Sequence, residues 1–314
     1  MKIVKRIDLA LLAAALFLGL VVPTAGAALA PAPRGASGGA TRFLVRPEGR
    51  IAYEEVGAGP LVVLVPGIGD TRQQYRFLAP ELAAAGYRVV SMDLRGLGES
   101  STGFSDYSAA AVGSDVVALL RELDAGPAGL VGQSMAAGAV AWAAAEAPDR
   151  VESLVLIGPF VRDVPPTSWL QGALMNGLVN GMLQRPWGAS AWSSYYDSLY
   201  PSAKPVDLPA YRAALSANVA ERGRLEALRA MMNASKADVD ARLEQVRART
   251  LVVMGTADPD FDGFVGGPAG EARVVADRLH GQVLMVEGAG HYPHVEMPAR
   301  VDPAIVRFVD GRGI

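Results

Sequence analysis

The stretch Leu130-Val131-Gly132-Gln133-Ser134-Met135-Ala136-Ala137-Gly138 decides the fold that we predict for this chain. In it an aliphatic run ends at a serine with small neighbours, and an alanine-rich segment typical of a helix follows at once. A serine on a sharp turn between a buried strand and a helix points its hydroxyl out of the sheet, above the free N–H groups of the helix N-terminus. Gly132 and Ala136 are small enough for such a bend. Alone, the pattern also fits an ordinary turn whose serine caps the helix, so the rest of the chain has to decide.

The composition is that of a globular protein. The chain has 314 residues, of which 51% are hydrophobic and 19% charged, enough for one large α/β domain or two smaller ones. A net charge of -3 offers no electrostatic basis for binding nucleic acid. With no cysteine in the sequence, disulfides, thiol nucleophiles and thiolate metal sites are excluded.

The first residues form a segment of their own. Lys2, Lys5 and Arg6 precede an apolar run from Leu9 to Val22 and small residues up to Ala27. This order predicts a secretory signal peptide over residues 1–27, and therefore a secreted protein. The run is short for a bilayer core of about 30 Å, which takes roughly 20 residues. Its apolar character continues beyond Pro23, however, so an uncleaved membrane anchor is the alternative. The glycine-rich residues 28–40 are expected to form a linker.

From about Thr41 the chain reads as a folded domain. Strand-like runs at 42–46 and 51–56 flank a turn and predict an antiparallel hairpin. We expect later strands at 61–65, 87–92, around Leu130, at 153–157, 251–254 and 283–286, and helices at 73–85, 112–123, up to Ala145, at 238–246, 274–279 and 303–309. Strands that alternate with helices predict an α/β fold, a mostly parallel sheet flanked by helices, with its core at 41–158 and 236–314.

The alternation fails between residues 159 and 235, where aromatic residues and methionines gather among prolines and glycines. We interpret this stretch as a helical lid, inserted over the serine, that supplies an apolar pocket. A plain packing layer on the sheet is the alternative, because the same residue types also fill cores. Candidate pocket residues are Trp169, Met175, Leu178, Met182, Trp187 and Trp192.

A serine hydroxyl becomes a good nucleophile only when a base takes its proton, and that base is best a histidine held by a carboxylate. The sequence has 3 histidines. His280 ends a predicted helix, where a cation favours the helix dipole. His294 suits a surface as well as a site. His291 lies in a loop directly after the last expected strand, which makes it the candidate base.

The carboxylate should also follow a strand, because sites in open parallel sheets assemble at the carboxyl ends of the strands. Asp258 follows the strand at 251–254, with Asp260 and Asp262 in the same loop, while Asp163 follows the preceding strand. Any one of these acids could be an ordinary turn residue. The order Ser134, Asp258, His291 along successive strands favours Asp258.

From about Ile51 to Val309, the insertion apart, the chain resembles the α/β-hydrolase family, in which a nucleophile elbow, a late acid and a final histidine come in this order. Asp93 to Ser100 resembles the family's Asp-x-Arg-Gly-x-Gly-x-Ser loop, and Gly290-His291 with Pro293 resembles the pattern around its catalytic histidine. The departures are Ala136 for the last glycine of the elbow, Pro66 for a histidine in the usual His-Gly, and Leu97 for a frequent histidine.

The resemblance implies a serine hydrolase with Ser134 as nucleophile, His291 as base and Asp258 as its orienting acid. It also implies that the backbone N–H groups of Ile68 and Met135 form the oxyanion hole, and that no cofactor or metal takes part. The expected partner is a small, mainly apolar ester or related acyl substrate, with no nucleic acid, and with a membrane only if the N-terminal segment is uncleaved.

Two other functions remain open on the same residues. One is a non-catalytic small-ligand binder or receptor with this fold. The other is a cofactor-free haloperoxidase or carbon–carbon bond hydrolase that uses the same triad. Dehalogenase or epoxide hydrolase chemistry is disfavoured, because those relatives have an aspartate where Ser134 stands.

Overall fold

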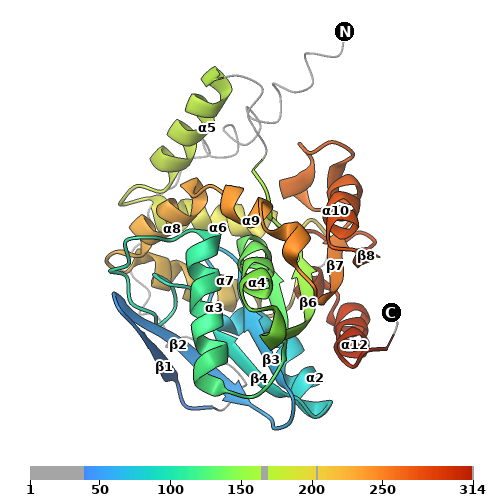
Figure 1. Cartoon of the computed structure of the whole chain (residues 1–314). Coiled ribbons are helices and arrows are strands. Elements are labelled where there is room, and N and C mark those ends of the chain that lie inside the picture. The colour runs from blue at the N-terminus through green and yellow to red at the C-terminus, as the bar shows by residue number, and fades with distance from the viewer. Residues whose placement is uncertain (1–38, 164–168, 203, 313–314) are drawn as a thin grey trace. The chain divides into compact units, whose positions relative to one another are not determined.

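A sheet of 8 strands, in the order β1-β2-β4-β3-β5-β6-β7-β8, lies at the centre of the computed structural model, which describes residues 39–163, 169–202 and 204–312 (Figure 1). The strands are β1 (Arg42–Arg46), β2 (Gly49–Val56), β3 (Leu61–Val65), β4 (Arg88–Met92), β5 (Ala128–Gln133), β6 (Val151–Ile157), β7 (Arg249–Gly255) and β8 (Gln282–Val286). Strand β2 pairs antiparallel with both of its neighbours, and all other pairs are parallel. The mostly parallel sheet predicted from the sequence is confirmed.

Helices cover both faces of this sheet. On one face Val63 and Leu130 belong to a core with α3 (Ala109–Leu123), α4 (Met135–Glu146) and α10 (Gly267–Arg278). On the other face Val62 and Val131 pack in a core with α2 (Leu78–Ala84) and α12 (Pro298–Val309). Successive residues of a strand point to opposite faces. A strand buried on both faces is therefore apolar throughout, as β3 is, and as β5 is up to Gly132.

The parallel register brings the loops after the strands to one edge. Val65 of β3 pairs with Gly132, Gln133 of β5 pairs with Ile157, and Gly255 of β7 pairs with Val286. The residues that follow these positions include Ser134, Asp258 and His291. This edge is where a site is expected in an open parallel sheet.

Between β6 and β7 lie the helices α5 (Trp169–Met182), α6 (Gly188–Ser198), α7 (Leu208–Ala220) and α8 (Arg224–Asn233). We call these four helices the lid. Asp163 at its start accepts hydrogen bonds from Ser235 Oγ and, at 3.1 Å and 3.0 Å, from the backbone N–H of Lys236 at its end. The carboxylate thus ties together the two chain segments that enter and leave the lid.

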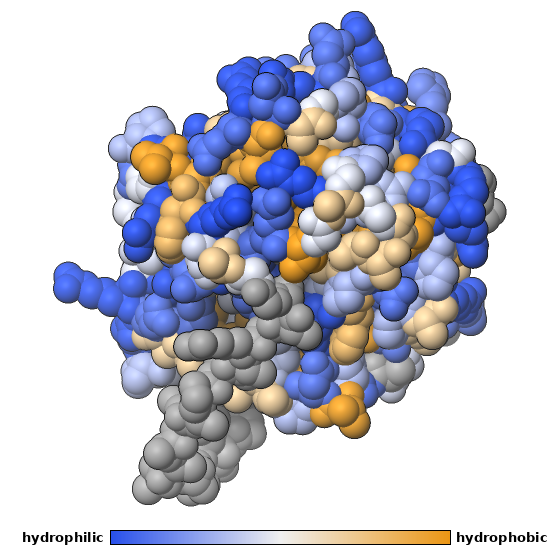
Figure 2. Space-filling view, turned by 90° about the horizontal axis from the view of Figure 1, so that it is seen from below, coloured by the Kyte–Doolittle hydropathy of each residue, from blue (hydrophilic) through white to orange (hydrophobic). Residues whose placement is uncertain are grey.

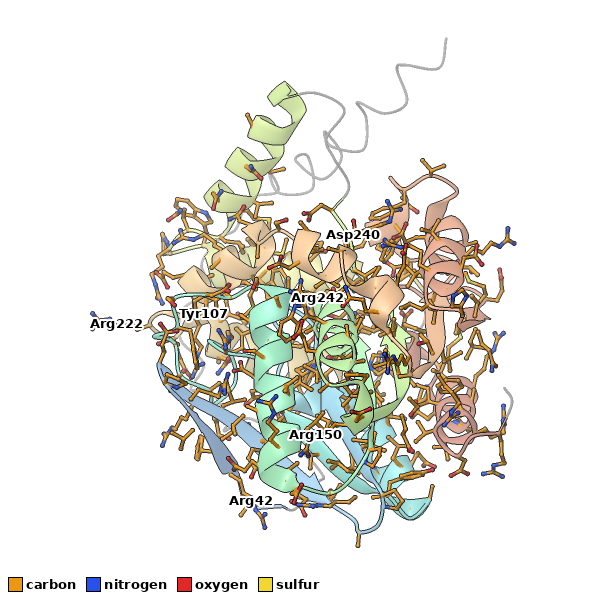
Figure 3. The ribbon with its side chains drawn as sticks, viewed as in Figure 1. Arg42, Tyr107, Arg150, Arg222, Asp240 and Arg242 are labelled. Atoms are coloured by element: carbon orange, nitrogen blue, oxygen red, sulfur yellow. The ribbon has the colours of Figure 1, made fainter. Side chains whose placement is uncertain are left out.

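Some helix bounds differ from the prediction. The helix expected at 238–246 is divided into α9 (Ala237–Asp240) and the 3₁₀ turn η4 (Leu243–Gln245). Arg242 lies between them (Figure 3). Its side chain binds Glu146 of α4 at 2.7 Å. Helix α12 begins earlier than expected, at Pro298, since proline suits the first position of a helix. The segment predicted at 73–85 is the 3₁₀ turn η2 (Arg72–Tyr75) followed by α2.

The predicted signal peptide, residues 1–27, and nearly all of the linker, residues 28–40, lie outside the described residues. Within the described part of the chain, every helix is too short or too polar to span a bilayer. The face of the molecule seen in Figure 2 is mainly hydrophilic and carries scattered apolar patches.

Candidate active site

Ser134 lies on the turn between β5 and α4 with φ 56° and ψ -125°, a strained conformation for a residue other than glycine. Two neighbours hold the turn: the Ser134 N–H donates to Ile157 O at 2.9 Å, and its carbonyl accepts from the Phe160 N–H at 3.1 Å. A Cβ at Gly132 would lie 2.4 Å from the Ala136 carbonyl oxygen. The small residues in the quoted stretch are therefore required by the close approach of the two backbone segments.

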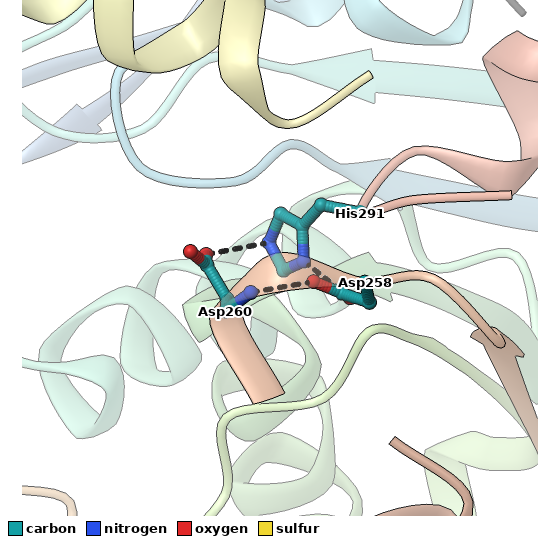
Figure 4. Close-up of side chains that lie close together, drawn as sticks. All are labelled: Asp258, Asp260 and His291. Carbon is teal, nitrogen blue, oxygen red and sulfur yellow. Dashed lines mark hydrogen bonds and ion pairs between the residues drawn. The ribbon is translucent and has the colours of Figure 1, made fainter. Parts of the chain in front are cut away.

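His291 and Asp258 form a buried pair, with Nδ1 of the ring 2.8 Å from Oδ2 of the carboxylate (Figure 4). Asp258 caps the 3₁₀ turn η5 (Pro259–Phe261), where its Oδ1 accepts the Asp260 N–H at 3.1 Å. The His291 carbonyl accepts from Gln133 Nε2 at 3.1 Å. Gln133 is the neighbour of Ser134, so the histidine loop is attached to the serine turn.

Ser134 and His291 both line a cavity of about 190 Å³. In the described part of the chain, no hydrogen bond joins Ser134 Oγ to the His291 ring, and Nε2 instead faces Asp260 Oδ2 at 3.8 Å. The apolar lining residues are Ile68, Met135, Phe160, Trp192, Leu199 and Met232, and the remaining polar ones are Tyr195, Lys236, Asp260 and Tyr292. The cavity is thus half apolar by residue count, with one carboxylate and one ammonium group in its wall.

The backbone N–H groups of Ile68 and Met135 face no acceptor among the described residues, and both residues line the cavity. Met135 begins α4, and the first N–H groups of a helix have no partner within the helix. The preceding Gly67 N–H donates to Gln74 Oε1 at 3.0 Å. A Cβ at Gly67 would lie 2.0 Å from Gln133 Oε1, so the loop needs glycine at this position.

The His291 ring lies among negative charges. Burial lowers its pKa, but the charge and hydrogen bond of Asp258 and the charge of Asp260 raise it, and the resulting pKa is about 9. A low-dielectric site strengthens such interactions. The ring is therefore mostly protonated at neutral pH.

The structure separates the other candidates from this site. His280 is exposed and follows α10, and Asp163 is exposed at the base of the lid. His294 is buried without a hydrogen-bond partner in the described chain, and its ring lies 5.4 Å from that of Tyr75. Burial, Arg76 and His291 lower the pKa of His294 to about 3.

The contacts of Asp93, from the loop that resembles the family's Asp-x-Arg-Gly pattern, hold the fold together and do not reach the cavity. Asp93 is buried, pairs with Arg72 and accepts the Glu99 N–H at 2.9 Å. Ser100 of the same loop accepts the Ala52 N–H at 2.9 Å. The loop therefore joins β2 to the sheet edge and brings no group to the cavity.

Of the six pocket residues predicted in the lid, Trp192 lines the cavity. Leu178 is 38% exposed, Trp187 is 55% exposed, and Met182 packs in the cluster around Leu183 and Leu228. The side chains of Trp169 and Met175 lie outside the described residues.

Sequence reasoning gave no site role to Tyr195, Met232 or Lys236, and it treated Asp260 only as a neighbour of Asp258. For Tyr195 a signal existed, since it lies three residues after Trp192 and therefore on the same side of a helix. Met232 and Lys236 line the cavity because the chain runs back to the sheet after α8. No residue spacing in the sequence predicts this path.

Asp258, Asp260 and His291 bring three potential metal-ligand atoms within 4.8 Å of one another. Asp258 Oδ2 and His291 Nδ1 already bind each other at 2.8 Å. The contacts between these side chains thus join the acid to the histidine ring, and we assign no metal to the group.

Comparison with known proteins finds relatives of the same fold. A Mycobacterium tuberculosis protein with the name "Putative non-heme bromoperoxidase BpoC" is 28% identical over 82% of this chain and 97% of its own length. The crystal structure of a hydrolase from Pseudomonas aeruginosa PA01 is 26% identical, with a TM-score of 0.72, over 87% of this chain and 99% of that one. An esterase from Thermogutta terrifontis has a TM-score of 0.68 at 22% identity, over 87% of this chain and 98% of that one.

The family match covers strands β3 to β8 and the loops of the candidate site. Residues 60–298 match the sequence model of the family described as alpha/beta hydrolase fold. This range contains the serine turn, the lid and the histidine loop. The chain therefore belongs to the α/β hydrolase fold family.

Proposed function

We propose that this protein is a serine hydrolase that cleaves an ester of a small, mainly apolar acyl group through a covalent acyl-enzyme. The observation that carries the proposal is the geometry at the cavity: a strained serine lines the same space as the His291 ring, which Asp258 holds from behind. Strain of this kind at a non-glycine residue is typical of functional sites. We also propose that the bond is an ester and that the protein is secreted.

In the proposed reaction, Nε2 of neutral His291 takes the proton of Ser134 Oγ as the oxygen attacks the acyl carbon. The tetrahedral intermediate collapses, the bond to the alcohol oxygen breaks, and His291 gives its proton to that oxygen. Water then attacks the acyl-enzyme, with His291 again as base, and the acid product and free Ser134 result. Asp258 keeps the Nδ1 proton directed to itself throughout, which leaves Nε2 to do the proton transfers.

The oxyanion formed in each attack needs donors that are free beforehand. The unpartnered N–H groups of Ile68 and Met135 at the cavity wall meet this requirement. Losing one such donor typically costs about 2.7–4 kcal/mol of transition-state stabilisation. These groups form the proposed oxyanion hole.

A fluorophosphonate probe and p-nitrophenyl butyrate test the proposal. We expect the probe to add covalently to Ser134, and Ser134→Ala to abolish both labelling and turnover. Ser105→Ala, a change at an exposed loop serine, is the matched control and should leave both unchanged. A folded protein that neither reacts at Ser134 nor turns over short esters would instead be a ligand binder.

The relative from Mycobacterium tuberculosis carries the name of a non-heme bromoperoxidase, so cofactor-free haloperoxidase chemistry on the same triad is the second candidate. It predicts bromination that requires hydrogen peroxide and a carboxylic acid and is lost in Ser134→Ala. Ester hydrolysis faster than this reaction by several orders of magnitude would favour the first candidate.

Secretion is tested separately, by sequencing the mature N-terminus, which we expect at Ala28.

A further inference from the structure

The His291 ring lies between two carboxylates (Figure 4). Asp258 Oδ2 is 2.8 Å from Nδ1, and Asp260 Oδ2 is 3.8 Å from Nε2, at the opposite edge of the ring. Nε2 is the nitrogen that must accept the serine proton in the proposed reaction. A carboxylate next to it has no role in the steps described above, so its presence requires an explanation.

Asp260 is held in place by the lid. The Tyr195 hydroxyl, on α6, lies 2.8 Å from each Asp260 oxygen, and the Tyr195 ring is 5.2 Å from that of Trp192. The Asp260 side chain is 18% exposed and lines the cavity. A lid helix therefore reaches the catalytic histidine through one tyrosine and one carboxylate.

The other charged groups around the ring do not neutralise Asp260. Burial and Asp260 raise the pKa of Tyr195, so its hydroxyl stays protonated and donates. Lys236 lines the cavity but lies 3.7 Å from Asp163, at the base of the lid. Asp70 adds further negative charge near His291, and the buried His294 ring is neutral, since burial, Arg76 and His291 lower its pKa.

We propose that Asp260 is a positioning residue for the catalytic base: held by Tyr195, it keeps the protonated His291 ring with Nε2–H directed to itself and away from Ser134. When the ring loses this proton to solvent through the cavity, the attraction disappears and the Nε2 lone pair becomes available to Ser134 Oγ–H. The absence of a hydrogen bond between Ser134 and His291 among the described residues agrees with this resting arrangement. The role of Asp260 in turnover rests on the proposed function. Its effect on the proton of the His291 ring does not.

The ring proton can be observed directly, because the chain has 3 histidines. In a nitrogen NMR titration the His280 signal is identified by its loss in His280→Gln. Burial lowers the pKa of His294 to about 3, so that ring stays neutral over the usual pH range and the remaining titrating signal belongs to His291. We expect Asp260→Asn to lower the His291 pKa by about one to three units, given the attraction of a charge near 4 Å at an intermediate dielectric constant. Asp262→Asn, a change at the exposed acid two residues along, is the matched control and should leave the titration unchanged.

Kinetics give a second measurement. In the wild type kcat/KM should rise with pH towards about 9, as the neutral form of His291 increases. In Asp260→Asn the rise should occur at lower pH. Turnover of p-nitrophenyl butyrate at pH 7 should then increase, because a His291 pKa that is lower by one gives about ten times as much neutral ring. The plateau at high pH should fall, because the imidazolium of the transition state loses a stabilising charge.

Tyr195→Phe is a second variant that tests the inference if Asp260→Asn does not fold. Without the tyrosine donor Asp260 is no longer held beside Nε2, and it loses a hydrogen bond that lowers its own pKa, so the His291 pKa should fall as in Asp260→Asn, but by less. A His291 titration that is the same in the wild type and in folded Asp260→Asn overturns the inference, as does a rise of the His291 pKa in folded Tyr195→Phe. If the His291 pKa changes as expected but the protein turns over no ester, the inference is supported and the proposed function is rejected.

Discussion

At the scale of single residues, the backbone of Ser134 stores strain for the proposed chemistry. Its φ of 56° lies in the region that favours glycine, and such a residue costs on the order of 1–3 kcal/mol. We therefore expect Ser134→Gly to be inactive yet more stable, by about 1 kcal/mol in urea unfolding after the entropy cost of glycine is subtracted. Ser134→Ala, which keeps a Cβ, should show no such gain. Equal stability of the two variants would mean that the turn is unstrained.

The two candidate acids can be separated by one amide substitution each. Asp258→Asn removes the charge that orients His291 Nδ1 and should lower kcat on the order of 10⁴-fold, as when the acid of a Ser-His-Asp triad is neutralised. Asp163→Asn should leave kcat within a few fold, because its partners are Ser235 and Lys236 at the base of the lid. The reverse result in steady-state assays would assign the triad acid to Asp163.

At the scale of elements, Asp70 joins the lid to the proposed oxyanion loop. This fully buried carboxylate accepts hydroxyls from Tyr196 of α6 at 3.1 Å, Tyr211 of α7 at 2.8 Å and Tyr292 at 2.8 Å. Burial raises its pKa to about 6, although the three tyrosine hydrogen bonds oppose that rise. The folded-state pKa lies above the unfolded value of 3.8, so the group favours the folded state most at low pH and loses this contribution as pH rises through about 6.

Tyr211→Phe tests this connection. Above pH 6 Asp70 is charged and the lost hydrogen bond should cost about 1.5–3 kcal/mol of unfolding free energy, whereas at pH 5 the neutral acid should lose only about 0.5–1.5 kcal/mol. Tyr87→Phe is a matched control, since it removes a partly buried hydroxyl that donates to Asp310 at the end of α12. Urea unfolding at pH 5 and pH 8 makes the comparison. A cost independent of pH would show that Asp70 does not titrate in this range.

The elements differ in how far the sequence could predict them. Strands such as β1 and β3 have the predicted bounds, because burial on one face leaves an alternating apolar signal and burial on both faces leaves a continuous one. The bounds of the lid helices were not predicted, since their apolar residues serve several neighbours at once. Ser134, Asp258 and His291 could be selected because each follows a strand. The Asp260–Tyr195 contact could not, because it depends on how the lid folds back over the sheet.

At the scale of the whole molecule, the lid and sheet together limit the size of the substrate. The cavity of about 190 Å³ is somewhat larger than the roughly 150 Å³ space that holds a benzene molecule in another protein. It should therefore accept an acyl group of about six to eight heavy atoms. The lid does supply apolar lining through Trp192, Leu199 and Met232, but Lys236 and Asp260 make the wall more polar than the composition suggested.

The final prediction concerns this size limit. Each buried methylene contributes about 0.8 kcal/mol, nearly fourfold in binding, so kcat/KM on p-nitrophenyl esters should rise from acetate to butyrate or hexanoate. Beyond about eight heavy atoms kcat/KM should fall, because the acyl chain outgrows the cavity.

Trp192 packs so closely on Gly69 that a Cβ at Gly69 would lie 2.2 Å from the Trp192 ring. Trp192→Ala should therefore enlarge the cavity and move the optimum to longer chains, whereas Trp187→Ala, at an exposed lid position, should leave it unchanged. A profile that falls from acetate onwards in the wild type, or an optimum that Trp192→Ala does not move, would mean that the acyl chain does not bind against the lid.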